Sequence, residues 1–355
     1  MKQSVRYIRT SDDISLAWAE VGRGMPLVKA ANWLTHLEYD WESPVWRHWT
    51  RFFATHYRYV RHDERGCGMT DWNAGDLSLS RWVRDLEQVV EAAGIDEPFA
   101  LLGISQGAAI AIAYAVRHPG RVSHLILYGG YATGIHKSGD AGAIRTFHAI
   151  TELMRSGWDK DNPVFRQLFT SRFIPGGSAE QLEWFNDLCR RTTSAEIGAR
   201  LMEARGNVDV GDLLSKVRTP TLVMQASNDQ VNHPAMGRRL AREIPDAQFV
   251  LLESANHVLL ENESAWLHFR EAILEFTGQH AASDGIAASD QPKLTPRENA
   301  VLALLCEGHS NAQIAWQLDI AEKTARNHVS HLYEKLGVHS RAEAIVYAHR
   351  RGLHG

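Results

Sequence analysis

Residues 101–119 read LLGISQGAAIAIAYAVRHP, and this stretch decides the fold of the longer part of the chain. An apolar run ends at Ile104, a polar bend follows at Ser105, and an Ala- and Ile-rich run typical of a buried helix begins at once. Gly103 and Gly107 flank the bend, where side chains would collide with the neighbouring strand and helix. The pattern predicts a strand, a tight turn and a helix, with the Ser105 hydroxyl presented at the turn.

Short apolar runs alternate with longer amphipathic stretches on both sides of this turn. The amphipathic stretches include residues 80–93 and 107–117. The apolar runs are ISLAWAEV (14–21), PLVKAANW (26–33), YRYVRHD (57–63), FALLGI (99–104), HLILYGG (124–130), TLVMQAS (221–227) and QFVLLES (248–254). Such alternation predicts the α/β class, with a doubly wound, mostly parallel sheet and helices on both faces.

Residues 131–215 interrupt this alternation. Their pattern is helical, and the segment is rich in aromatic side chains: Phe147, Trp158, Phe165, Phe169, Phe173, Trp184 and Phe185. We interpret the segment as a helical lid inserted between two strands. We expect a ligand-binding cleft beneath this lid, with Trp33 near it. Aromatic side chains around such a cleft predict an apolar or aromatic ligand.

A serine nucleophile needs a base and an acid, which in this kind of sheet follow it in the order Ser, Asp, His. Asp229 lies in a loop after an apolar run, and His257 comes after the next run. The predicted roles are Ser105 as nucleophile, His257 as general base and then acid, and Asp229 as the group that orients the imidazole. Three other carboxylates compete for the role of Asp229: Asp212, Asp246 and Glu253.

With these residues in place, positions 5–278 resemble the α/β-hydrolase family. The segment YVRHDERGCGMTDW (59–72) is similar to the family's DxRGxGxS stretch, with Asp63, Arg65, Gly66 and Gly68 at the matching positions. The resemblance implies ester, lactone or amide cleavage through an acyl-enzyme formed on Ser105.

The chain departs from the family at the oxyanion hole. Where relatives usually carry His-Gly, it reads Ala31, Asn32 and Trp33. The resemblance places one oxyanion donor at the backbone N–H of Trp33 or Asn32 and the other at that of Gln106. Loss of one such donor lowers the rate by about 10²–10³-fold. The sequence is therefore compatible with slow turnover, or with ligand binding without turnover.

The second part of the chain follows a change of composition. Residues 279–292, QHAASDGIAASDQP, show no apolar periodicity and predict a linker. The expected organisation is thus a domain at 1–278, the linker, and a small all-α domain at 293–355. The last domain holds 8 Lys and Arg against 6 Asp and Glu, a net charge of +2 that permits nucleic-acid binding without indicating it.

Four short helices are predicted after the linker. The first begins with a capping box, with Thr295 as N-cap, Pro296 at the first helical position and Glu298 three residues after the cap. The second begins at Asn311. The third, in KTARNHVSHLYEKLG (323–337), has apolar residues at spacings of four, three and four, which leaves a polar opposite face suited to the DNA major groove. Its buried positions are Ala325, Val329, Leu332 and Leu336.

Residues 294–353 resemble the LuxR-type (GerE-like) helix-turn-helix domain through LTPREN, EGHSNAQIA, the spacing of Thr324 and His328, KLGV and SRAEAI, with departures at Ala321 and Ala325. The resemblance implies binding to promoter or operator DNA as a homodimer, with a fourth helix at 341–349 that joins two subunits. It implies base contacts from Arg326, Asn327 and Ser330, and phosphate contacts from Lys323, Thr324 and Lys335. His331 lies on the same polar face.

Other features of the sequence argue against several classes of protein and site. The start of the chain has no apolar region typical of a signal peptide, and no apolar run reaches the roughly 20 residues of a membrane span, so we expect a cytoplasmic protein without membrane contact. Cys67, Cys189 and Cys306 are isolated and odd in number, which argues against a disulfide framework or a zinc site. The sequence has no Gly-rich phosphate loop and no cluster of ligands at metal spacing, so neither a cofactor nor a metal is expected.

Two functions remain open. The first is a transcriptional regulator in which the lid and cleft bind a small effector. The second is a serine hydrolase, an esterase or lactonase, in which DNA binding is secondary. A sensor that slowly cleaves its effector combines the two.

Overall fold

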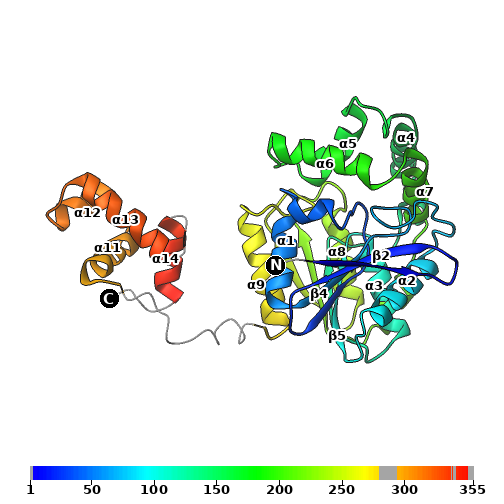
Figure 1. The fold of residues 1–355 in the computed structure, drawn as a ribbon, viewed down its shortest axis with the longest axis horizontal. Coiled ribbons are helices and arrows are strands. Elements are labelled where there is room, and N and C mark those ends of the chain that lie inside the picture. Colours follow the sequence, from blue (N-terminus) through cyan, green and yellow to red (C-terminus); the bar gives the residue numbers. More distant parts are fainter. Residues whose placement is uncertain (1–2, 280–293, 337, 339–340, 351–355) are drawn as a thin grey trace. The chain divides into compact units, whose positions relative to one another are not determined.

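The computed structural model describes residues 3–279, 294–336, 338 and 341–350. The chain forms two compact units, Met1–Gln279 and His280–Gly355 (Figure 1). Apart from Gln279, the predicted linker lies outside the described residues.

An eight-stranded sheet forms the centre of the first unit, in the order β1-β2-β4-β3-β5-β6-β7-β8. The two pairings at the β1 edge are antiparallel, and all pairings from β4 to β8 are parallel. The strands are β1 (Ser4–Arg9), β2 (Ser15–Val21), β3 (Pro26–Lys29), β4 (Arg58–His62), β5 (Phe99–Ile104), β6 (Val122–Tyr128), β7 (Thr221–Ala226) and β8 (Gln248–Leu252). Every residue of β5 is buried, which explains its uninterrupted apolar run.

Helices cover both faces of this sheet. On one face, α1 (Arg47–His56) and α9 (Ser264–Phe276) lie side by side, joined by the rings of Trp49 and Trp266 at 4.9 Å (Figure 1). A second group packs against the sheet and against its own members: α2 (Leu79–Ala92), α3 (Gly107–Arg117), the short 3₁₀ helix η3 (Gly211–Lys216) and α8 (Pro234–Glu243). The predicted α/β-hydrolase fold class is confirmed.

Four consecutive helices stand between β6 and β7, within the segment interpreted as a lid. They are α4 (Ala141–Gly157), α5 (Val164–Phe173), α6 (Ala179–Thr192) and α7 (Ala195–Gly206). Figure 1 shows them gathered at one end of the sheet. Side-chain caps begin three of these helices, at Asp140, Ser178 and Ser194.

The second unit is helical. It contains α11 (Pro296–Cys306), α12 (Asn311–Gln317), α13 (Glu322–Leu336) and α14 (Arg341–Arg350). Thr295 and Glu298 form the predicted capping box. The predicted inner positions of α13 are buried, in a core that also holds Ala344 and Ala348 of α14. Among the described residues of both units, no helix is long and apolar enough to cross a membrane.

Candidate functional site

Ser105 occupies the sharp turn between β5 and α3. Its φ is +54°, in the left-handed region that non-glycine residues rarely adopt. A Cβ at Gly103 would lie 2.6 Å from Ala108 Cα, and one at Gly107 would lie 2.9 Å from Ala31 O. Glycine is therefore required on both sides of the turn for the reason predicted from the sequence.

His257 and Asp229 meet although they lie 28 residues apart. His257 Nδ1 is 2.7 Å from Asp229 Oδ2, and both side chains are almost completely buried. An ionised carboxylate can only accept, so the imidazole must carry its proton on Nδ1. In the neutral ring, Nε2 is then free to accept a proton. This nitrogen is buried and has no hydrogen-bond partner among the described residues.

Asp229 is well suited to remain charged. Its Oδ1 accepts from the backbone N–H of Val231 and Asn232 at 2.8 and 3.0 Å, and its Oδ2 accepts from Gln225 Nε2 at 3.0 Å. Burial by itself raises the pKa of Asp229, but the charge and hydrogen bond of His257 and the two backbone N–H groups hold the pKa below its usual value. The competing carboxylates are exposed, and none of them bonds to His257: Asp212, Asp246 and Glu253.

Asn232 holds the Ser105 hydroxyl. Its Nδ2 donates to Ser105 Oγ at 3.3 Å and to Gly129 O at 2.7 Å. The sequence did not indicate this contact, because nothing in the spacing shows that the loop of Asn232 returns to the turn of Ser105. The structure thus brings Ser105, Asp229 and His257 to one place, with the bond from serine to imidazole not formed.

The predicted oxyanion donors flank the same place. Both Trp33 and Gln106 line the cavity beside Ser105. Neither residue donates its backbone N–H to another described residue. Unengaged N–H groups near a nucleophile are what an oxyanion requires.

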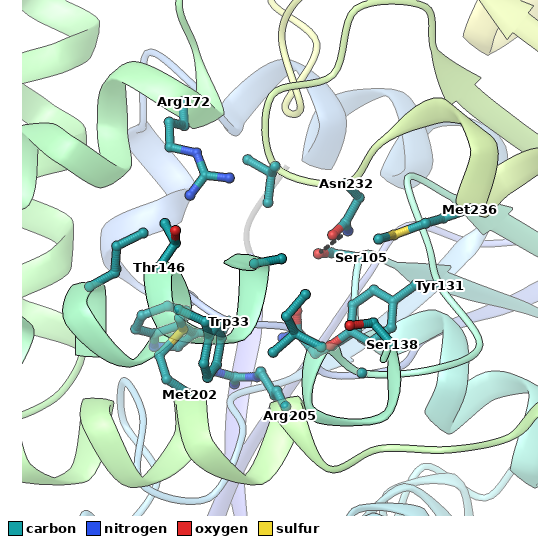
Figure 2. Close-up of a pocket in the computed structure, with 18 of the residues that line it drawn as sticks. Trp33, Ser105, Tyr131, Ser138, Thr146, Arg172, Met202, Arg205, Asn232 and Met236 are labelled. Carbon is teal, nitrogen blue, oxygen red and sulfur yellow. Dashed lines mark hydrogen bonds between the residues drawn. The ribbon is translucent and has the colours of Figure 1, made fainter. Parts of the chain in front are cut away.

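A cavity of about 360 Å³ opens over Ser105 (Figure 2). Its size lies at the lower end of the range for small-molecule sites. Lid side chains form much of its apolar wall, and the rest comes from the core. The apolar lining residues include Trp33, Ile135, Phe147, Ile150, Phe169, Phe173, Met202, Val231 and Met236.

The lid is fastened to the loops that carry the site. Phe173 O accepts from the His257 N–H at 2.8 Å, and Asn256 Oδ1 accepts from the Gly176 N–H at 2.8 Å. On the other side, the buried Arg205 of α7 is paired with Glu64, which lies in the family-like segment after β4. Sequence reasoning missed Glu64 and Arg205, because they are 141 residues apart.

No group of three or more metal-binding side chains occurs among the residues that the structure describes.

The predicted DNA-contacting residues share one property: all are exposed. They are Lys323, Thr324, Arg326, Asn327, Ser330, His331 and Lys335. Two of them have acidic neighbours, since Arg326 pairs with Glu322 at 3.1 Å and Lys335 pairs with Glu298 at 2.7 Å. Both pairs lie at the surface, where such bonds contribute little and can be exchanged for phosphate contacts.

The helix predicted to join two subunits also has contacts within its own domain. Ala344 and Ala348 of α14 are buried against the core of that domain, and α14 contacts α11 and α13.

Two family models match the chain. Residues 47–265 match the serine aminopeptidase S33 family, and residues 292–348 match the luxR family of bacterial regulatory proteins. The two matches cover the two parts of the chain that the structure separates.

Individual proteins match the first part. A relative named "Putative carbamate hydrolase RutD", from Escherichia coli O157:H7, is 27% identical over 236 residues, which cover 61% of this chain and 85% of RutD. Among solved structures, an esterase from Exiguobacterium antarcticum has a TM-score of 0.65 at 22% identity, covering 78% of this chain and all of that chain. A hydrolase from Pseudomonas aeruginosa has a TM-score of 0.64 at 23% identity, covering 78% of this chain and 98% of that chain. These two likenesses show the fold.

Proposed function

The chain belongs to the serine aminopeptidase S33 family and carries a LuxR-type DNA-binding domain, and we propose that it is a transcriptional regulator whose hydrolase domain binds a small apolar or aromatic ester, lactone or amide. The observation that carries this proposal is the largely apolar cavity over Ser105, in the same chain as an exposed recognition helix. A DNA-binding domain has no use in a purely metabolic enzyme. The cavity supplies the place where an effector is recognised.

The DNA side of the proposal follows from α13. Arg326, Asn327 and Ser330 face base edges, and Lys323 and Thr324 contact phosphates. The regulator acts in the cytoplasm as a homodimer on a two-fold symmetric operator. The effector changes the affinity for the operator because it binds one state of the regulator more tightly than the other.

Catalysis by the same site requires one rotation. When Ser105 Oγ turns from Asn232 to His257 Nε2, the imidazole takes the hydroxyl proton and the oxygen attacks the carbonyl carbon of the effector. The N–H groups of Trp33 and Gln106 stabilise the oxyanion. His257 then gives the proton to the leaving group, and water, activated by the same imidazole, releases the acid from Ser105.

A second candidate function is a serine hydrolase in which DNA binding is secondary. The bonded pair of His257 and Asp229 favours retained chemistry, because a pocket that only binds does not need an oriented base. A sensor that slowly cleaves its effector unites both functions, since turnover then ends the signal.

The first experiment separates enzyme from sensor. Purified full-length protein is tested with p-nitrophenyl esters, lactones and a p-nitrophenyl carbamate, beside a Ser105→Ala variant. The carbamate is included because the name of the matched relative refers to carbamate hydrolysis. Activity that disappears in Ser105→Ala supports the triad, and activity that survives removes Ser105 from its role.

The second experiment tests regulation. A ligand of the panel is added to the Ser105→Ala protein, which cannot consume it, and binding to a DNA fragment selected by the full-length protein is measured. The proposal expects the ligand to change the Kd for this fragment at least about fivefold. An unchanged Kd with every ligand that binds the cavity contradicts it.

A further inference from the structure

The charges that line the cavity have one sign. Among the described residues around it, the charged ones are Arg172 of α5 and Arg205 of α7, and no Asp or Glu is present. In the view of Figure 2, Arg172 lies at the top and Arg205 at the bottom, with Ser105 to the right of both. A largely apolar cavity with a positive lining favours a ligand that carries negative charge.

Arg205 lines this cavity and has donors that no described residue uses. Its side chain is 6% exposed and pairs through Nη2 with Glu64. Its Nε and Nη1 are buried and have no hydrogen-bond partner among the described residues. The guanidinium lies 4.9 Å from the centre of the Trp33 ring, which also lines the cavity. Buried donors without partners are costly, so an oxygen acceptor in the cavity would be bound favourably.

The charges behind Arg205 do not repel an anion. Cations and carboxylates are equal in number in this buried group, and burial raises the pKa of Asp40 to about 7, so that this carboxyl is partly neutral near physiological pH. The group consists of the cations Lys29, Arg61, Arg65 and Arg205 and the carboxylates Asp40, Asp63, Glu64 and Asp85. An anionic ligand beside Arg205 is therefore not repelled by a net negative charge of this group.

Arg172 adds a positive charge that no described residue neutralises through an ion pair. Its Nε and Nη2 donate to Gln230 O at 3.1 and 2.7 Å, and it forms no ion pair with a described residue. Burial lowers the pKa of Arg172, and the more distant Asp229 offsets this only in part. A guanidinium in this position attracts an anion that enters the cavity.

We propose that the cavity selects a ligand that joins an apolar body to a free carboxylate. The carboxylate accepts hydrogen bonds from Arg205, and Arg172 adds long-range attraction. This inference rests on the proposed ligand-binding function and names the class of ligand that the site takes.

The test compares two probes of the same shape, 4-phenylbutyrate and its neutral amide, 4-phenylbutyramide. Their Kd values for the wild-type full-length chain are measured by titration calorimetry near pH 7. We expect the acid to bind at least about tenfold more tightly than the amide, because a charge-assisted hydrogen bond is stronger than a neutral one. Equal Kd values overturn the proposal.

Two variants show which arginine is responsible. The double variant Glu64→Gln/Arg205→Gln removes both charges of the buried pair, so that neither is stranded. It should reduce the preference for the acid to within about twofold. Arg172→Gln, at an exposed position, should reduce the preference about threefold. Full preference in the double variant contradicts the role of Arg205.

Hydrolysis of the neutral ester p-nitrophenyl butyrate, measured on the same preparation, separates this inference from the proposed function. If the ester is cleaved through Ser105 while acid and amide bind equally, the carboxylate inference fails and the ligand-binding function stands. If neither probe binds and no ester is cleaved, both fail.

Discussion

Asn232 Nδ2 donates a hydrogen bond to Ser105 Oγ at 3.3 Å, so the nucleophile is held by an amide and not by its base. His257 Nε2, the nitrogen that should take the serine proton, is buried without a partner among the described residues. Asp229 and His257, the proposed acid and base, are thus already joined, and Ser105, the proposed nucleophile, has still to turn. Asn232 acts as a positioning residue that competes with the imidazole for Ser105.

Replacing Asn232 with Ala should speed the attack of Ser105. A hydrogen bond of this length contributes about 1 kcal/mol or less, so its loss should raise the rate of acylation by a fluorophosphonate probe about two- to fivefold. Asn228→Ala, at an exposed position in the same loop, is the control and should react at the wild-type rate. A slower Asn232→Ala variant would show that the amide assists the nucleophile.

Asp229→Asn should inactivate the site without unfolding it. An amide in this position can donate to Nδ1 and stabilise the wrong imidazole tautomer, and kcat for ester hydrolysis should fall by about 10⁴-fold. Asp212→Asn removes an exposed carboxylate that competed for the same role in the sequence. A comparable loss in Asp212→Asn would mean that the hydrogen bond between Asp229 and His257 does not identify the acid.

The sequence predicted most of what depends on local pattern. The nucleophile turn, seven of the eight strands and the inner face of α13 follow from periodicity over a few residues. The strand β1 was missed because its side chains are exposed or only half-buried at the edge of the sheet, and such a strand shows no clear apolar alternation. The contacts of Asn232 with Ser105 and of Glu64 with Arg205 join distant segments, and no local pattern encodes them.

Arg326→Ala should weaken and broaden DNA recognition. Losing one base contact of an arginine costs about 1–3 kcal/mol, so the Kd for a fragment selected by the wild-type chain should rise about 5–150-fold, with little change for unrelated DNA. Ester hydrolysis should be unaffected. Arg242→Ala, an arginine of the hydrolase domain whose side chain is 77% exposed, is the matched control. Equal losses of DNA binding and hydrolysis would point to unfolding instead.

Asp12 should make the hydrolase domain sensitive to acid. A hydrogen bond from the buried Arg65 holds the pKa of Asp12 at about 2, below its value of about 4 in an unfolded chain. Its stabilising contribution is therefore complete above pH 4 and is lost as the pH falls towards 2. The urea midpoint of Asp12→Asn should lie below that of wild type at pH 7 and approach it at pH 2.5.

Tryptophan fluorescence measures this midpoint, because ten of the eleven tryptophans precede residue 280. Asp13→Asn, which changes the next residue, is the control, because the side chain of Asp13 is 80% exposed. The change in its urea midpoint between pH 7 and pH 2.5 should equal that of wild type. A constant difference between Asp12→Asn and wild type from pH 7 to pH 2.5 would contradict the role of the pair with Arg65.

Gly129→Ala should displace the base. Gly129 has a φ of +58°, and an added Cβ would lie 3.0 Å from His257 Cε1, closer than side chains normally approach. A shift of the imidazole by a fraction of an ångström changes its position relative to Ser105, and kcat should fall about 10²-fold.

Gly94→Ala is the matched control, since Gly94 has a φ of +60° and nothing within 4 Å of the added Cβ. Both variants should lose a similar amount of stability from backbone strain, about 1 kcal/mol, which thermal unfolding measures. Because only Gly129→Ala contacts the imidazole, only its kcat should fall, and an equal fall in Gly94→Ala would assign the effect to strain.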